Sequence, residues 1–192
     1  MRYEKNEIRN GNAQEVRVPV ADDLRVIRQS HAQSCGAAAL ATYYREVLGR
    51  PMSEGEMLRR LKTRKAVDMD RLRRECRRDG LVAHGYGLDI DTLARVGRPA
   101  IVYLPGSRTT GHFAVLRGMA DGRVRLADPA ERDRHLARGR FVELWSGRAG
   151  GEGKALFVAE SGVDWLPLTE CSLSDEPRRD PDWFPVRRAR IG

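Results

Sequence analysis

Residues 28–44, RQSHAQSCGAAALATYY, place a cysteine directly in front of a strong helix-forming run. The stretch 36–48 is rich in Ala and Leu and is followed by Gly49 and Pro51, so we expect one helix that ends there. The Cys35 sulfur then lies at the positive end of the helix dipole, which lowers the pKa of a thiol and favours the nucleophilic thiolate. Cys35 is therefore the first candidate catalytic residue.

Two more helices are expected after this one. Ser53 and Glu56 have the spacing of a capping box, and Asp68 can cap another helix that ends at Gly80. The densest basic stretch, 59–78, falls on these helices, and its apolar residues are spaced as a buried stripe. We therefore expect its arginines on a solvated outer face. A nucleic-acid surface, or attraction to acidic peptides or anionic envelope lipids, are the alternatives.

After residue 80 the hydrophobic period changes from that of helices to that of strands. Strands are expected at 81–87, 99–104, 112–119, 123–128 and 154–160, and short helices at 89–97 and 141–145. Asp121 and Gly122 give the turn signal of a hairpin between two of these strands. Helices first and antiparallel strands afterwards indicate an α+β fold, with N-terminal helices packed on an antiparallel sheet.

We expect a single domain at residues 21–160, as a length of 192 residues suggests. Residues 1–20 are polar and are expected to form an N-terminal arm, with alternating valines near its end that fit a short edge strand. Residues 161–192 contain four prolines and are expected to be an irregular C-terminal extension.

The composition excludes several classes of protein. The chain has 35 Lys and Arg against 27 Asp and Glu, a net charge of +8 that by itself leaves nucleic-acid binding open. Only 6% of the residues are aromatic, too few for a base-stacking protein, and no nucleic-acid-binding signature is present, so we expect no nucleic-acid partner. No run approaches the roughly 18 apolar residues of a membrane span, so we expect no integral membrane segment.

The three cysteines, Cys35, Cys76 and Cys171, are too few for a disulfide scaffold. They also lack the Cys and His spacing of a zinc site, and we expect neither a metal nor a cofactor. Cys76 lies in a charged helical stretch and is expected to be half-buried. Cys171 could pair with Cys76 or stay free.

A cysteine nucleophile needs a base, and His112 is the candidate. It follows a Gly- and Thr-rich loop and opens an apolar strand, where its side chain can project into a cleft. The next strand of the hairpin ends at Asp128, which a simple registry places within one or two residues of being the cross-strand neighbour of His112. Asp128 can then accept from one imidazole nitrogen and leave the other facing the thiol. His31, four residues before Cys35, is the rival base.

Gln29 is the candidate oxyanion stabiliser. It precedes Cys35 by six residues, and its amide can donate a hydrogen bond beside the backbone N–H of Cys35. One such donor is worth about 2.7–4 kcal/mol in acyl transfer.

These motifs resemble the bacteriocin-processing, or double-glycine-leader, peptidase family, a branch of the papain-like cysteine peptidases. The resemblance spans residues 24 to 160 and rests on RQSHAQSCGAAALATYY, TGHFAVLRG and VRLADPA. The family has Gln, five residues, Cys-Gly, a later His that opens an apolar strand, and then Asp-Pro. The resemblance therefore implies a papain-like fold, with Gln29 as the oxyanion glutamine, Cys35 as the nucleophile, His112 as the base and Asp128 as the residue that orients it.

The sequence departs from the transporter-linked members of that family. It has neither a membrane span nor a G-x-x-x-x-G-K-[ST] phosphate loop, and so resembles the stand-alone Gram-negative type. Ser34 stands where transporter-linked members usually carry Asp, as it does in many stand-alone members.

The resemblance implies a cysteine endopeptidase that cleaves a glycine-containing segment of a secreted peptide or surface-fibre protein. The expected partners are that substrate and components of an export or surface-fibre system, and we expect a monomer. A catalytically silent domain that binds a leader peptide, and a papain-like amidase or transferase, are the alternatives.

The stand-alone type also implies the periplasm or cell envelope. The opening residues lack the apolar core of a signal peptide, which leaves a cytoplasmic protein, or an exported one whose leader has been removed, as the two interpretations.

Overall fold

The computed structural model describes residues 26–63, 65–105, 111–147, 151–161 and 187–188. The expected N-terminal arm with its valines lies outside the described residues. So do Cys171, nearly all of the expected C-terminal extension and part of the Gly- and Thr-rich loop.

The described residues form helices and strands in the predicted order, with two additional short strands. The helices are α1 (Cys35–Glu46), α2 (Glu54–Leu61), α3 (Met69–Arg78), α4 (Ile90–Val96) and α5 (Arg138–Ser146). The strands are β1 (Val82–Leu88), β2 (Ala100–Leu104), β3 (His112–Ala120), β4 (Arg123–Asp128), β5 (Arg132–Ala137), β6 (Gly153–Ala159) and β7 (Arg187–Arg188).

The helix starts follow the local capping signals. The side chain of Ser53 accepts a hydrogen bond from the backbone N–H of Glu56 at 3.2 Å, and Asp68 accepts one from the backbone N–H of Arg71 at 2.7 Å. Both predicted N-caps are therefore confirmed. The first helix begins at Cys35 itself, one residue earlier than predicted.

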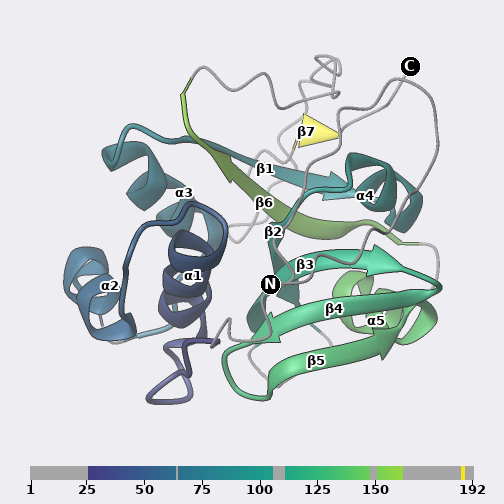
Figure 1. Cartoon of the computed structure of the whole chain (residues 1–192), viewed down its shortest axis with the longest axis horizontal. Coiled ribbons are helices and arrows are strands. Elements are labelled where there is room, and N and C mark those ends of the chain that lie inside the picture. The colour runs from purple at the N-terminus through teal and green to yellow at the C-terminus, as the bar shows by residue number, and fades with distance from the viewer. Residues whose placement is uncertain (1–25, 64, 106–110, 148–150, 162–186, 189–192) are drawn as a thin grey trace, which may run out of the picture.

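The strands form one sheet in the order β5-β4-β3-β2-β6-β1-β7. All neighbouring pairs are antiparallel except β1 and β7, which run parallel. The predicted α+β fold, with N-terminal helices on an antiparallel sheet, is confirmed (Figure 1). The missed strand β5 has the sequence RDRHLA and lies at the sheet edge with four of its six residues exposed, so it lacks the hydrophobic signal of a buried strand.

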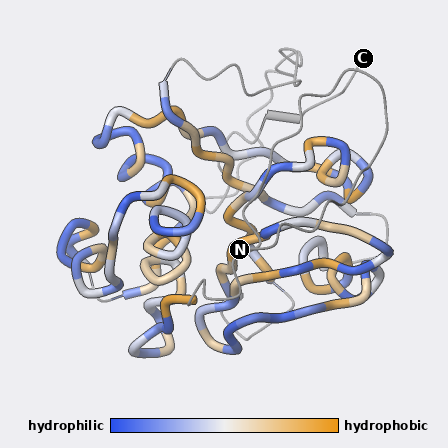
Figure 2. The backbone as a smooth tube through the Cα atoms, in the orientation of Figure 1, coloured by the Kyte–Doolittle hydropathy of each residue, from blue (hydrophilic) through white to orange (hydrophobic). Residues whose placement is uncertain are grey.

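Helices cover both faces of the sheet and create two hydrophobic cores. The first core lies between the sheet and α1, α2 and α3, and the second lies between the sheet, α4 and α5. Figure 2 shows α2 and α3 as more hydrophilic than the central strands.

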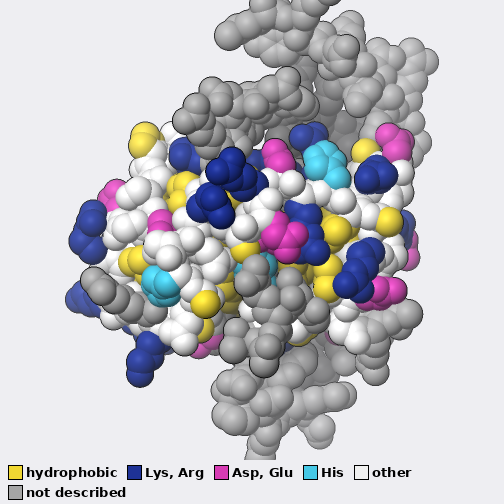
Figure 3. All heavy atoms as spheres, turned by 90° about the horizontal axis from the view of Figure 1, so that it is seen from below, with side chains coloured by type: hydrophobic (Ala, Val, Ile, Leu, Met, Phe, Trp, Pro, Cys, Tyr) yellow, Lys and Arg dark blue, Asp and Glu magenta, His cyan; other side chains and the backbone are white. Residues whose placement is uncertain are grey.

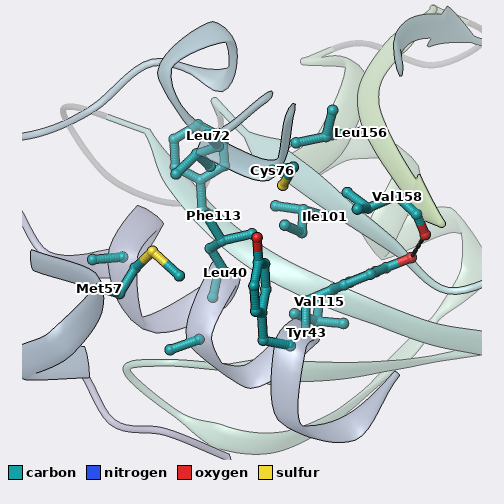
Figure 4. Close-up of a cluster of buried hydrophobic side chains, with 14 of the residues drawn as sticks. Leu40, Tyr43, Met57, Leu72, Cys76, Ile101, Phe113, Val115, Leu156 and Val158 are labelled. Carbon is teal, nitrogen blue, oxygen red and sulfur yellow. Dashed lines mark hydrogen bonds between the residues drawn. The ribbon is translucent and has the colours of Figure 1, made fainter. Parts of the chain in front are cut away.

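The first core anchors the helix that carries Cys35. Leu40 and Tyr43 of α1 pack against strand residues, and the Tyr43 hydroxyl donates a hydrogen bond to the Val158 carbonyl at 2.9 Å (Figure 4). Cys76 lies in this core and is fully buried, so the expectation of a half-buried thiol is wrong. Its neighbours on α1 and α2 cover the side chain that its charged sequence context suggested would be partly exposed.

Candidate active site

Cys35 is the first residue of α1 and is 8% exposed. No acidic residue occupies the first helical turn, so the positive end of the helix dipole is not neutralised locally. The segment before α3 packs closely against Gly36. A Cβ at position 36 would lie only 2.5 Å from Cγ2 of Val67, so a larger residue there would clash. The small residue after the cysteine therefore permits close packing around the helix start.

Ser34 closes the turn that leads into Cys35. Its hydroxyl accepts a hydrogen bond from the His31 backbone N–H at 3.2 Å and donates one to the His31 carbonyl at 2.9 Å. The serine at this position thus has a local structural role.

His112 and Asp128 lie side by side on adjacent strands. Nε2 of His112 is 2.6 Å from Oδ1 of Asp128, and the two residues are 1% and 0% exposed. Nδ1 of His112 is buried and makes no hydrogen bond to a nitrogen or oxygen atom of the described residues. One imidazole nitrogen is thus occupied by the carboxylate and the other is open for the thiol.

A β-bulge brings these two side chains to the same face of the sheet. Strands β3 and β4 pair Gly118 with Arg125, but the register then shifts and pairs Val115 with Ala127. One step further, Asp128 lies opposite Ala114, two residues from His112, and residues two apart share a face. Without the extra residue Arg117, Asp128 would lie opposite Val115, and its side chain would project from the opposite face of the sheet to that of His112.

Arg117 is fixed by an ion pair to the helix that carries Cys35. Its guanidinium donates to both carboxylate oxygens of Glu46 on α1, at 2.8 and 2.6 Å. It also contacts Asp133 on β5. The side chains of Arg117 and Glu46 are only 12% and 3% exposed, so solvent screens this pair weakly.

Asp128 has partners on both carboxylate oxygens. Besides His112, Oδ1 accepts from the backbone N–H of Ala130 at 2.9 Å, whereas Oδ2 lies 3.3 Å from a guanidinium nitrogen of Arg134 on β5. Burial by itself raises the pKa of Asp128, but hydrogen bonding and charge from His112, together with backbone N–H groups, hold it below its usual value. Asp128 is therefore ionised beside the imidazole.

The thiol and the imidazole shift each other toward the charged forms. Burial alone raises the pKa of Cys35, but hydrogen bonds from His112 and the Phe113 backbone, with the charge of His112, bring it below the ordinary value. Burial alone lowers the pKa of His112, but Asp128 and Cys35 outweigh that effect and raise it to about 9. The arrangement favours a thiolate–imidazolium pair at neutral pH.

Gln29 joins the segment before α1 to the turn after Asp128. Its backbone N–H donates to the Pro129 carbonyl at 3.0 Å, and its side-chain amide donates to the His31 carbonyl at 3.0 Å. Its Oε1 is buried without a hydrogen-bond partner in the described residues. One amide hydrogen remains for an oxyanion, which is the role that the sequence predicts for Gln29.

The rival base, His31, lies in the turn 31–34 that precedes Cys35. The shifted pKa of Cys35 has His112, and not His31, among its causes. The structure therefore brings Cys35 together with His112.

Gly111 allows His112 to begin its strand in this position. Its φ is +72°, and a Cβ there would lie 2.1 Å from the Tyr103 hydroxyl, so any other residue would strain both the backbone and the contact.

Two of the residues that support the site, Arg117 and Arg134, were not anticipated from the sequence. In the sequence both look like ordinary surface charges. In the structure Arg117, in the bulge of β3, pairs with Glu46 at the last residue of α1, and Arg134, on the missed strand β5, contacts Asp128. Among the described residues, no group of three or more His, Cys, Asp or Glu side chains could hold a metal ion. In that same part of the chain, every helix is too short or too polar to cross a membrane.

Comparison with known sequences identifies a family and relatives of this chain. Residues 23–150 match the profile of the Peptidase C39 family. The chain is 29% identical over 130 residues to the "Probable functional amyloid protease FapD" of Pseudomonas fluorescens. It is also 32% identical over 126 residues to an uncharacterised protein of Methanothermobacter marburgensis.

The match has a different extent in each relative. It covers 64% of this chain and 57% of the Pseudomonas protein, so the chain spans little more than half of that relative. It covers 65% of this chain and 85% of the archaeal protein.

Two solved structures share the fold. The peptidase domain of Streptococcus ComA, a bifunctional ABC transporter, superimposes with a TM-score of 0.62 at 21% identity, over 71% of this chain and 98% of that domain. A double-glycine-motif protease from an AMS/PCAT transporter, solved in complex with a leader peptide, gives a TM-score of 0.58 at 24% identity, over 69% of this chain and 89% of that one.

Proposed function

The chain belongs to the peptidase C39 family, and from that premise we propose that it is a cysteine endopeptidase that cleaves a glycine-containing segment of a secreted peptide or surface-fibre protein. The observation that carries the proposal is the buried alignment of Cys35, His112 and Asp128, in which Nε2 of His112 meets the carboxylate and Nδ1 is left for the thiol. We assign this activity to residues 21–160 as the peptidase domain.

In the proposed mechanism the Cys35 thiolate attacks the peptide carbonyl, and negative charge develops on its oxygen. The free hydrogen of the Gln29 amide and the backbone N–H at Cys35 stabilise that oxyanion. Protonated His112 transfers its Nδ1 proton to the leaving amine, which breaks the C–N bond and leaves a thioester on Cys35. His112 then takes a proton from water, whose oxygen attacks the thioester and releases the acid product and the thiolate.

Asp128 has a positioning and electrostatic role in this scheme. It holds the imidazole through Nε2 and stabilises the imidazolium form, as a triad carboxylate does. The contacts from Ala130 and Arg134 fix the carboxylate in turn.

The names of the relatives support the substrate class. One is called a functional amyloid protease, and one solved neighbour is a double-glycine-motif protease bound to a leader peptide. We therefore propose a peptide or surface-fibre substrate that meets the enzyme in the periplasm or cell envelope, together with components of its export system.

The test uses short extended peptides with a central Gly-Gly pair and matched peptides with Ala-Ala at that position. We expect mass spectrometry to detect cleavage next to the glycines, and Cys35→Ala to reduce the rate by about 10³-fold or more. Equal cleavage rates for the wild type and Cys35→Ala would show that Cys35 takes no part in the reaction and would contradict the proposal.

The same samples separate the two alternatives. A silent leader-binding domain would bind a peptide without cleaving it, in the wild type as in Cys35→Ala. A transferase would give mainly the aminolysis product when an amine such as hydroxylamine is added, because the two activities differ only in what accepts the acyl group.

A further inference from the structure

Nearly all of the net charge of the protein comes from one short stretch. Ten of the 35 Lys and Arg residues, but only three of the 27 acidic residues, lie between positions 59 and 78. This stretch therefore carries +7 of the net charge of +8, and the rest of the chain is close to neutral. A charge concentrated in this way acts locally, as a feature of α2, α3 and the segment between them.

The acids of this stretch are used inside the structure. Asp70 and Glu75 are 8% and 2% exposed and pair with nearby arginines, and Asp68 caps α3 through the backbone N–H of Arg71. Arg60, which is only partly exposed, lies 2.8 Å from Glu75 and ties α2 to α3. Asp70 and Glu75 also pair with the exposed Arg74 and Arg78, so these two acids offset part of the outer charge.

Six of the exposed cations form a surface that we call the basic face. It consists of Arg59, Lys62, Lys65, Arg71, Arg74 and Arg78. Arg77 is exposed as well, but its guanidinium donates to the Ala83 carbonyl on β1. Figure 3 shows Lys and Arg side chains projecting at the left edge of the molecule, on the side where α2 lies in Figure 1.

The basic face is continuous across the two helices. Arg71, Arg74 and Arg78 are spaced three and four residues apart and so share one side of α3. The Arg71 guanidinium donates to the Leu61 carbonyl at the end of α2, which brings this row beside Lys62.

The basic face also adjoins the catalytic cysteine. Val67 lies between Lys65 and α3 in the chain, and its side chain packs directly over Gly36, the residue after Cys35. The segment that carries Lys65 therefore lies against the start of the helix that carries Cys35.

We propose that the basic face binds an acidic segment of the polypeptide substrate and holds it beside Cys35. This inference rests on the proposed peptidase function. Two observations favour a peptide over other polyanions. Residues 59–78 contain no aromatic side chain on which a base could stack, and their large apolar side chains are buried or half-buried and so cannot insert into a lipid surface.

The test measures binding to Cys35→Ala protein by fluorescence anisotropy, with a labelled peptide of alternating Glu and Gly. The triple variant Arg59→Gln/Lys62→Gln/Lys65→Gln removes three exposed charges, and no ion pair to another described residue is lost. We expect the Kd for the Glu peptide to rise by about tenfold, as for three exposed ion pairs of about 0.5 kcal/mol each. Added salt should weaken wild-type binding.

The matched control is Arg123→Gln/Arg125→Gln/Arg132→Gln, which removes the same charge from exposed positions on β4 and β5. We expect its Kd to change by less than about twofold. Equal losses in the two triple variants would overturn the proposal, because they would show an effect of net charge alone. So would equal affinity of the unmodified face for a Gln-Gly peptide.

Two further probes decide the class of partner. Tighter binding of a single-stranded DNA oligonucleotide of equal charge, or of phosphatidylglycerol vesicles, would replace the acidic peptide by nucleic acid or lipid and overturn the proposal. Cleavage of Gly-Gly peptides by the wild type is read separately. Binding of the Glu peptide without cleavage contradicts the proposed function alone, and cleavage without a basic-face effect contradicts this inference alone.

Discussion

Cys35 and Cys76 are both buried free thiols on helices that face the same core, yet their surroundings have opposite effects. Cys35 begins α1 and lies beside His112, and its pKa is lowered despite burial. Cys76 lies in the last turn of α3. Burial, and then the carboxylates of Asp79 and Glu75, raise its pKa to about 12, although Tyr44 acts in the other direction.

The difference shows that burial does not decide the reactivity of a thiol in this fold. Each cysteine loses contact with water, but one gains a helix N-terminus and an imidazolium, whereas the other gains two carboxylates. The sign of the nearby charge therefore decides whether the pKa of a buried thiol falls, as at Cys35, or rises, as at Cys76.

The largest expected effect is the difference in alkylation rate between the two thiols. At pH 7 only about one Cys76 side chain in 10⁵ is a thiolate, given a pKa of about 12. We expect iodoacetamide to label Cys35 at least about 10³ times faster than Cys76, as followed by mass spectrometry of each cysteine peptide.

His112→Ala is the variant that should make Cys35 resemble Cys76. Burial remains while the imidazolium is removed, so the pKa of Cys35 rises and its labelling slows, with Cys76 in the same sample as an internal reference. Similar rates for the two cysteines in the wild type would contradict the comparison.

The next largest effect is expected at Arg117, which links the bulge of β3 to α1. Arg117→Met leaves the buried Glu46 carboxylate without its bidentate partner, and we expect the free energy of unfolding to fall by about 3 kcal/mol. Urea unfolding measures this loss, and alkylation should show Cys35 slowed as the β3 register loosens.

The double variant Arg117→Met/Glu46→Leu supplies the control for that experiment. It removes both charges, so most of the lost stability should return. A double variant as unstable as the sum of the single ones would mean that the ion pair does not account for the effect.

The smallest expected effect is a shift in pH dependence caused by Asp128→Asn. The carboxylate helps to raise the pKa of His112 to about 9, so the imidazolium persists to that pH in the wild type. Asparagine still accepts from Nε2 but carries no charge. The pKa of His112 should therefore fall, and the alkaline limb of the pH profile for peptide cleavage, which requires protonated His112, should move to lower pH by about one unit.

Arg134→Gln is the matched variant of opposite charge. It removes a cation from the other oxygen of Asp128, so it should not move the alkaline limb to lower pH. An unchanged limb in Asp128→Asn would show that the carboxylate does not set the titration of His112.

Much of this arrangement follows from local sequence signals. Ser53, Asp68 and Asp89 cap helices as short-range hydrogen-bonding rules require, and Asp121-Gly122 forms the hairpin turn with both φ angles positive. The hairpin places Asp128 two residues from being the cross-strand neighbour of His112, within the predicted range, but the two side chains share a face only because of the bulge at Arg117.

The remaining features depend on tertiary packing that no local pattern encodes. The bulge at Arg117 lies next to Gly118, a residue type that often marks a bulge, but the ion pair of Arg117 to Glu46, 71 positions away, follows from no local pattern. Strand β5 is recognised only by its pairing with β4, and Cys76 is fully buried because α1 and α2 cover a helix that is highly charged in sequence.

The hydrogen bond from the Gln29 backbone to the Pro129 carbonyl closes the site into a ring. The ring runs from Cys35 to His112, across to Asp128, on to Pro129, and back through Gln29 along the chain to Cys35. Because these contacts are connected in a ring, local opening of the ends of β3 and β4 also removes a hydrogen bond that holds the segment before Cys35. The site is therefore expected to lose its alignment as one cooperative unit, so that the reactivity of the Cys35 thiol depends on the local stability of these strand ends.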